Sequence, residues 1–98
     1  MTVDKLIPIT ESELLEAVKA AINAKGNNYN DDTISVWIFN VKQDLIEAGV
    51  TADVLGSTCA VGCIAKGVND IWVEHLPEYS TMFDRMAYRL ADTKVVTE

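Results

Sequence analysis

The side chains best suited to chemistry in this sequence are its two cysteines and its single histidine. Cys59 and Cys63 are four residues apart and His75 follows, a set that could supply a Cys–His catalytic pair or part of a metal site. On one helix His75 would lie about three to four turns beyond the thiols, so only a second copy of the chain could bring them together. We therefore expect buried free thiols. An enzyme or metal protein built on these three residues is one alternative.

The carboxylates and glycines give weaker signals. Asp31-Asp32 is explained by helix capping, and Asp70 with Glu74 is a lone carboxylate pair at helical spacing, which is weak evidence for a cation site. Neither of the glycine-rich patterns that hold phosphates occurs in the sequence. The sequence thus predicts no catalytic residue, no metal, no cofactor and no enzymatic activity.

Hydrophobic periodicity predicts the helices that position these residues. Thr10 and Glu13 have the spacing of a capping box at the start of a first helix, over residues 11–24. An apolar stripe then recurs at helical spacing, and its members are Leu14, Leu15, Val18, Ala21 and Ile22.

A second helix is predicted between an acidic cap at residues 31–32 and Gly49. Its core face consists of Ile34, Trp37, Ile38, Val41, Leu45 and Ala48. Val36, Phe39 and Ile46 lie off this face. They either contact another part of the same small core or meet a neighbouring subunit.

A third helix is predicted over about residues 58–76, after an irregular connector at residues 50–56. It is apolar over most of its circumference, yet small residues give it a thin side: Ala60, Gly62, Ala65 and Gly67. Such a helix must be covered on most sides. We expect other copies of the chain to provide part of that cover.

A shorter fourth helix is predicted from a cap at residues 80–81, because Pro77 bars a simple continuation of the third. Its apolar face consists of Met82, Phe83, Met86, Ala87 and Leu90. Arg85 and Arg89 share another face, where we expect them to pair with nearby acids; the alternative is a local basic spot.

Length and composition bound the fold class. With 98 residues, of which 49% are hydrophobic, the chain has the size of one domain with a real core. We predict an all-α fold, a small four-helix bundle with one long central apolar helix. The single domain covers residues 1–98, and we expect residues 1–8 and 93–98 to be loose.

The charge and the apolar runs exclude several classes of function. The net charge of −7 argues against wholesale phosphate binding, which uses clustered Lys and Arg. No apolar run is long enough to span a bilayer, so we expect no membrane contact. The first residues lack the basic and apolar regions of a signal peptide, so we expect a protein that stays in the compartment where it is made.

The segment Ala-Val-Gly-Cys-Ile-Ala-Lys-Gly-Val-Asn-Asp-Ile-Trp, residues 60–72, carries a family resemblance. Together with Ser-Thr-Met-Phe-Asp-Arg at residues 80–85, it resembles the head-to-tail connector proteins of tailed phages that infect Gram-positive bacteria. The opening Ile-Thr-Glu-Ser-Glu-Leu-Leu at residues 9–15 resembles the start of that family. The likeness covers roughly residues 7–92.

This resemblance implies a structural virion protein that assembles as a homo-oligomeric ring of about a dozen copies. The ring docks below the portal protein and extends the channel through which DNA passes without sequence-specific binding. It then offers a surface to the next head-completion or tail protein. The implied location is the head–tail junction of the virion, after assembly in the cytoplasm of the host bacterium.

A ring requires two different contact patches on each subunit. The candidates for subunit-interface residues are Val36, Phe39 and Ile46 on the second helix and Gly62, Lys66 and Asp70 on the third. The main alternative to a connector is a small cytoplasmic helical module for protein–protein interaction, or a regulator.

Overall fold

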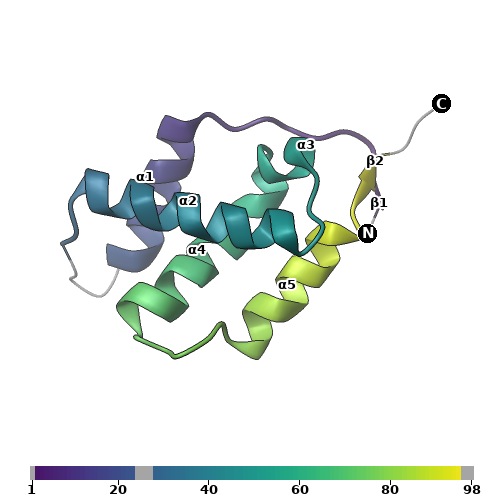
Figure 1. The fold of residues 1–98 in the computed structure, drawn as a ribbon. Coiled ribbons are helices and arrows are strands. Elements are labelled where there is room, and N and C mark those ends of the chain that lie inside the picture. Colours follow the sequence, from purple (N-terminus) through teal and green to yellow (C-terminus); the bar gives the residue numbers. More distant parts are fainter. Residues whose placement is uncertain (1, 24–27, 96–98) are drawn as a thin grey trace.

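The computed structural model describes residues 2–23 and 28–95, which are mostly helical, and this confirms the all-α prediction (Figure 1). The helices are α1 (Glu11–Asn23), α2 (Asp31–Glu47), α3 (Ala52–Leu55), α4 (Val61–Val68) and α5 (Thr81–Ala91). A 3-10 turn η1 (Thr58–Ala60) precedes α4, and a π-helical turn η2 (Asn69–Val73) follows it. No helix in the described part is long and apolar enough to cross a membrane.

Local capping starts α1 and α5 where the sequence predicts. The Glu13 N–H donates to Thr10 Oγ1 at 3.1 Å, and the Thr10 N–H donates to Glu13 Oε1 at 3.0 Å, so the capping box is confirmed. At α5 the Phe83 N–H donates to Ser80 Oγ at 3.3 Å. Both caps form between residues three positions apart, which is why sequence spacing reveals them.

The predicted third helix is central but not uniform. α4 contacts α1, α2 and α5, and the turns η1 and η2 extend it at its two ends. In η2 the Glu74 N–H donates to the carbonyl oxygen of Asn69, five residues back, at 2.8 Å. The helical segment stops at His75, whose φ is 56°. The expected connector at residues 50–56 also differs, since it contains the one-turn helix α3.

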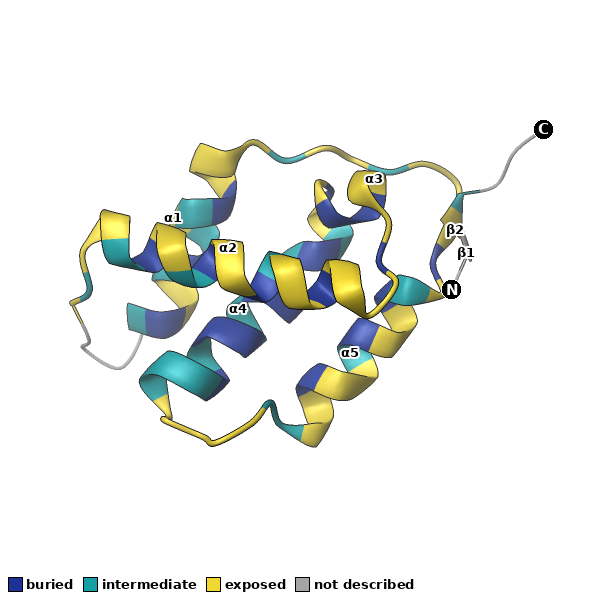
Figure 2. Cartoon of the chain, viewed as in Figure 1, coloured by how far each residue is buried: buried dark blue, intermediate teal, exposed yellow. Residues whose placement is uncertain are grey.

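The thin side of the central segment is covered within the chain. A Cβ built on Gly67 would lie 2.7 Å from Phe83 Cε2 of α5 and 2.9 Å from Val41 Cγ1 of α2. Both neighbours are buried. The expectation that other copies cover this side is therefore wrong at Gly67. The buried residues lie on the sides of the helices that face inward (Figure 2).

The described parts of both terminal segments are tied down rather than loose. β1 (Thr2–Val3) pairs in parallel with β2 (Lys94–Val95), so these two segments, far apart in the sequence, lie side by side (Figure 1). The Ile9 N–H donates to Gly56 O at 3.0 Å, and the Thr58 N–H donates to Ile7 O at 2.8 Å. These long-range hydrogen bonds correct the prediction of loose ends for the residues that the structure describes.

Candidate functional site

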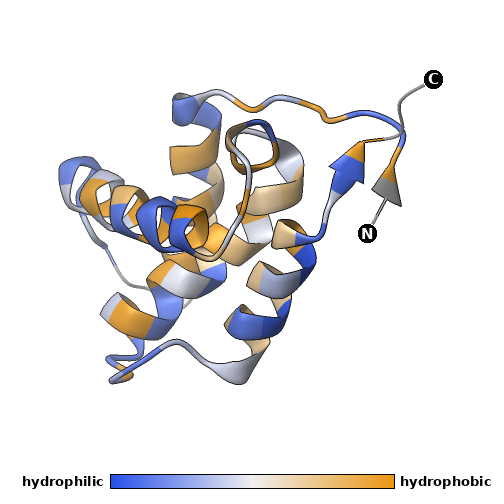
Figure 3. Ribbon diagram, turned by 45° about the vertical axis from the view of Figure 1, so that its right-hand side comes forward, coloured by the Kyte–Doolittle hydropathy of each residue, from blue (hydrophilic) through white to orange (hydrophobic). Residues whose placement is uncertain are grey.

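The outward side of α2 carries exposed apolar side chains. Val36 is 58% exposed, Phe39 60% and Ile46 48%, and we call these three residues the α2 strip. The buried face of the same helix consists of Ile34, Ile38, Val41 and Leu45. Hydrophobic residues therefore occur on more than one side of α2 (Figure 3). The prediction that the strip lies off the core face is confirmed, and exposure removes the alternative that it packs into the chain's own core.

A groove runs beside the strip, between α1 and α2, and reaches α3. Its volume is about 630 Å³. Its apolar lining comes from Leu14, Leu15, Ile38, Phe39, Ile46 and Leu55. Because Phe39 and Ile46 belong to both features, strip and groove form one apolar surface. A large exposed apolar surface on a small protein marks an interaction site more often than chance exposure does.

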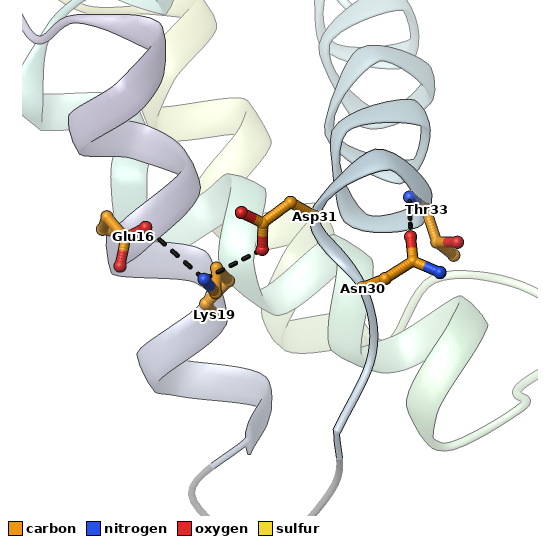
Figure 4. Close-up of polar contacts among 5 residues, drawn as sticks. All are labelled: Glu16, Lys19, Asn30, Asp31 and Thr33. Carbon is orange, nitrogen blue, oxygen red and sulfur yellow. Dashed lines mark hydrogen bonds and ion pairs between the residues drawn. The ribbon is translucent and has the colours of Figure 1, made fainter.

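An ion pair joins α1 and α2 away from the residues that line the groove, next to the cap of α2 (Figure 4). Lys19 Nζ on α1 lies 2.9 Å from Asp31 Oδ1 on α2 and 3.5 Å from Glu16 Oε1. The hydrogen bond to Asp31 raises the pKa of Lys19 above its ordinary value. The cap of α2 is Asn30, whose Oδ1 accepts from the Thr33 N–H at 2.8 Å, so the prediction of an acidic cap was wrong.

Acidic side chains surround the α2 strip. Asp32 lies one turn before Val36, and Glu47 directly follows the strip at the end of α2. Glu11 of α1 stands on the opposite rim of the groove. None of these three carboxylates forms an ion pair with any residue that the structure describes. The surface is therefore apolar in its middle and negative at its edges, with Lys42 as the basic residue in the groove lining.

The three subunit-interface candidates on the predicted third helix are not all exposed, unlike those on α2. Gly62 is exposed, Lys66 is partly buried and Asp70 is only 1% exposed. Lys66 Nζ lies 2.9 Å from Asp70 Oδ1, and the Ser80 N–H donates to Asp70 Oδ2 at 3.0 Å. Asp70 therefore links η2 to the start of α5 inside one chain. The prediction that Asp70 contacts a neighbouring subunit is therefore corrected, because its carboxylate is buried and already bound by Lys66 and Ser80 of the same chain.

Two opposing effects act on the ionisation of Asp70. Burial alone would raise the pKa of this carboxyl. The hydrogen bonds from Ser80 and Lys66, together with the positive charge of Lys66, outweigh burial and hold the pKa below its ordinary value. The charged form is thus the one that the fold accommodates.

The three residues that could take part in catalysis or metal binding, Cys59, Cys63 and His75, do not form one site. Cys63 is a buried free thiol, as predicted, and burial raises its pKa to about 12. Cys59 is a free thiol but only partly buried. His75 is exposed beyond η2 at the far end of the segment. Across residues 2–23 and 28–95, no group of three or more His, Cys, Asp or Glu side chains is arranged to hold a metal ion.

α5 exposes a second surface, which the sequence analysis assigned in part to the core. Met82 is 61% exposed and Tyr88 77%, so the assignment of Met82 to the core face was wrong. Arg85 and Arg89 are exposed beside them, and neither forms an ion pair within the described ranges, contrary to expectation. The sequence signal that could have shown Met82 to be exposed is the helical spacing of the buried positions, which are Phe83, Ala87 and Leu90. We call Met82, Arg85, Tyr88 and Arg89 the α5 patch.

Aromatic and polar contacts of Tyr79, which precedes α5, link α5 to α2. The Tyr79 hydroxyl donates to the Asp44 carboxylate of α2. Its ring stacks on Phe83 with a centroid distance of 3.9 Å. Burial, followed by the bond to Asp44, raises the pKa of Tyr79, so the hydroxyl stays protonated as a donor. These contacts connect the helices that carry the two exposed surfaces.

Comparison with protein-family models, with curated proteins and with solved structures gives no match to this chain.

Proposed function

We propose that this chain is a structural subunit of a head-to-tail connector ring in a tailed phage. The observation that carries the proposal is the α2 strip, an apolar surface left open by a domain whose core is filled. A second copy of the chain, the portal protein or the next head-completion protein would cover it. The resemblance of residues 60–72 and 80–85 to connector proteins supports this assignment.

The charge of the chain suits a channel through which DNA must slide. A net charge of −7 repels phosphates, so a wall of such subunits limits adhesion to the passing duplex. On this proposal the subunit is a small helical bundle located at the head–tail junction of the virion. DNA passes through the channel without sequence-specific binding, and the subunit performs no chemistry.

Light scattering after size-exclusion chromatography, together with negative-stain imaging, tests the proposal. We expect rings of the purified chain, or a monomer that forms rings on portal complexes. A variant carrying Val36→Ser, Phe39→Ser and Ile46→Ser should lose this assembly while staying folded. Ile7→Ser removes an equally exposed apolar side chain elsewhere and should leave assembly intact. A wild-type protein that stays monomeric and ignores portal complexes would contradict the proposal.

The second candidate function is a helical interaction module, and the groove between α1 and α2 favours it. A groove of about 630 Å³ with an apolar floor can accept the apolar face of one helix of a partner protein. On this alternative the chain remains monomeric with portal complexes present and binds a cytoplasmic regulator in one-to-one complexes. Measurement of stoichiometry by light scattering separates the two functions.

A further inference from the structure

The two exposed surfaces of this chain differ in chemistry and lie on different helices. The α2 strip is apolar with acidic edges, whereas the α5 patch combines Met82 and Tyr88 with the basic Arg85 and Arg89. These are the only two arginines in the sequence, and they stand four residues apart on a chain with a net charge of −7.

We propose that the α5 patch of one copy docks on the α2 strip of the next copy, in a head-to-tail contact. This inference rests on the proposed ring function and identifies the surfaces through which the copies meet. Charge complementarity selects a second copy as the occupant. Glu11 and Glu47 flank the strip without an ion-pair partner in the described part of the chain, and Arg85 and Arg89 likewise lack one.

The α5 patch presents one side of a helix, which is a shape that can seat against a groove. Met82, Arg85 and Arg89 follow one another at steps of three and four residues, so they form one stripe about 10 Å long on α5. The apolar member of the stripe meets Phe39 and Ile46 at the groove, while the arginines reach the acidic rims. Lys42 stands in the groove lining and repels the approaching arginines, so Lys42→Gln should tighten the contact.

A contact between two different patches is heterologous, and this has a direct consequence. When two copies bind in this way, one of them retains a free α2 strip and the other retains a free α5 patch. Repetition of the same contact therefore generates a closed ring or a helical filament rather than a symmetric dimer. The docking thus supplies the type of interface that the proposed function requires.

Two charge-reversal variants test the docking. The first carries Arg85→Glu and Arg89→Glu, and the second carries Glu11→Lys and Glu47→Lys. Each variant alone presents like charges at the contact, so we expect its self-association, measured by sedimentation, to be at least about tenfold weaker than that of the wild type. Mixed in equal amounts, the two variants present opposite charges at every contact, and we expect assembly to return.

A control variant and the remaining outcomes separate this inference from the proposed function. Lys5→Glu with Lys94→Glu makes the same change in net charge away from α5 and should assemble like the wild type. Circular dichroism of every variant establishes that it is folded. If the wild type assembles and folded charge-reversal variants assemble equally well, or if mixing them restores nothing, the docking is wrong and the ring function stands. If the wild type never assembles, with or without portal complexes, both are overturned.

Discussion

Gly67 offers the sharpest test of the packing described above, because one methyl group there should destabilise the fold. In Gly67→Ala the new Cβ would lie 2.7 Å from Phe83 Cε2 and 2.9 Å from Val41 Cγ1. Favourable carbon–carbon contacts require about 3.5–4.0 Å. Phe83 is 3% exposed and Val41 0%, so neither side chain can swing into solvent.

The magnitude follows from two opposing contributions. Overpacking of a filled core costs about 1–3 kcal/mol. Replacement of glycine by alanine within a helix recovers at most about 1 kcal/mol. With the full recovery subtracted, we expect the free energy of unfolding of Gly67→Ala to fall by up to about 2 kcal/mol.

Gly62→Ala is the matched control, since it makes the same change on the same helix. There the new Cβ meets only Met86 Cε, at 3.3 Å, and the end of a methionine side chain moves easily. We expect no loss of stability and a gain of up to about 1 kcal/mol. Urea unfolding followed by circular dichroism, at a concentration where each protein is monomeric, gives both values. A Gly67→Ala protein as stable as Gly62→Ala would refute the reasoning.

Three further outcomes test other features of the fold. Asn30→Ala should lower the free energy of unfolding by about 1 kcal/mol through loss of the α2 cap, whereas Asp32→Ala should change it by only a few tenths, as measured by thermal melting. Because folding lowers the pKa of Asp70, its charge stabilises the fold above the unfolded pKa of about 3.9, and this contribution is lost as the pH falls through the lower folded value. Urea midpoints should therefore show Asp70→Asn less stable than the wild type at pH 7, with a difference that shrinks below about pH 4; a constant difference would count against this assignment. In a Cys59→Ser background, Cys63 should react with a thiol reagent at least about tenfold more slowly in the folded protein than in urea, and equal rates would show that the thiol is accessible.

The features that sequence reasoning predicted depend on neighbours along the chain. The capping box of Thr10 and Glu13 and the cap at Ser80 involve residues three positions apart, so spacing alone reveals them. The outward position of Phe39 followed in the same way from the helical period of α2. The missed cap at Asn30 has an equally local cause, since asparagine and aspartate are similarly good N-caps and neighbouring positions compete.

The features that it did not predict depend on contacts between distant segments. The pairing of β1 with β2 joins segments about 90 residues apart in the sequence, and no local pattern in either strand specifies it. Asp70 can be buried only because Ser80 and Lys66 bind its charged carboxylate. The general expectation that charged residues lie at the surface is therefore wrong for Asp70. The exposure of Met82 depends on which side of α5 meets the central segment, a choice that Phe83 decides by packing against Gly67.

The turn η2 has a consequence for the curvature of any assembly built on head-to-tail docking. Identical copies close into a circle only if the rotation from each copy to the next divides a full revolution; otherwise they wind into a spiral. That rotation depends on the angle between α2 and α5, which the Asp70–Ser80 and Tyr79–Asp44 hydrogen bonds set from within the subunit. Changes in the interior at η2 would therefore alter how many copies complete the circle, although no residue at the contacts between them had been replaced.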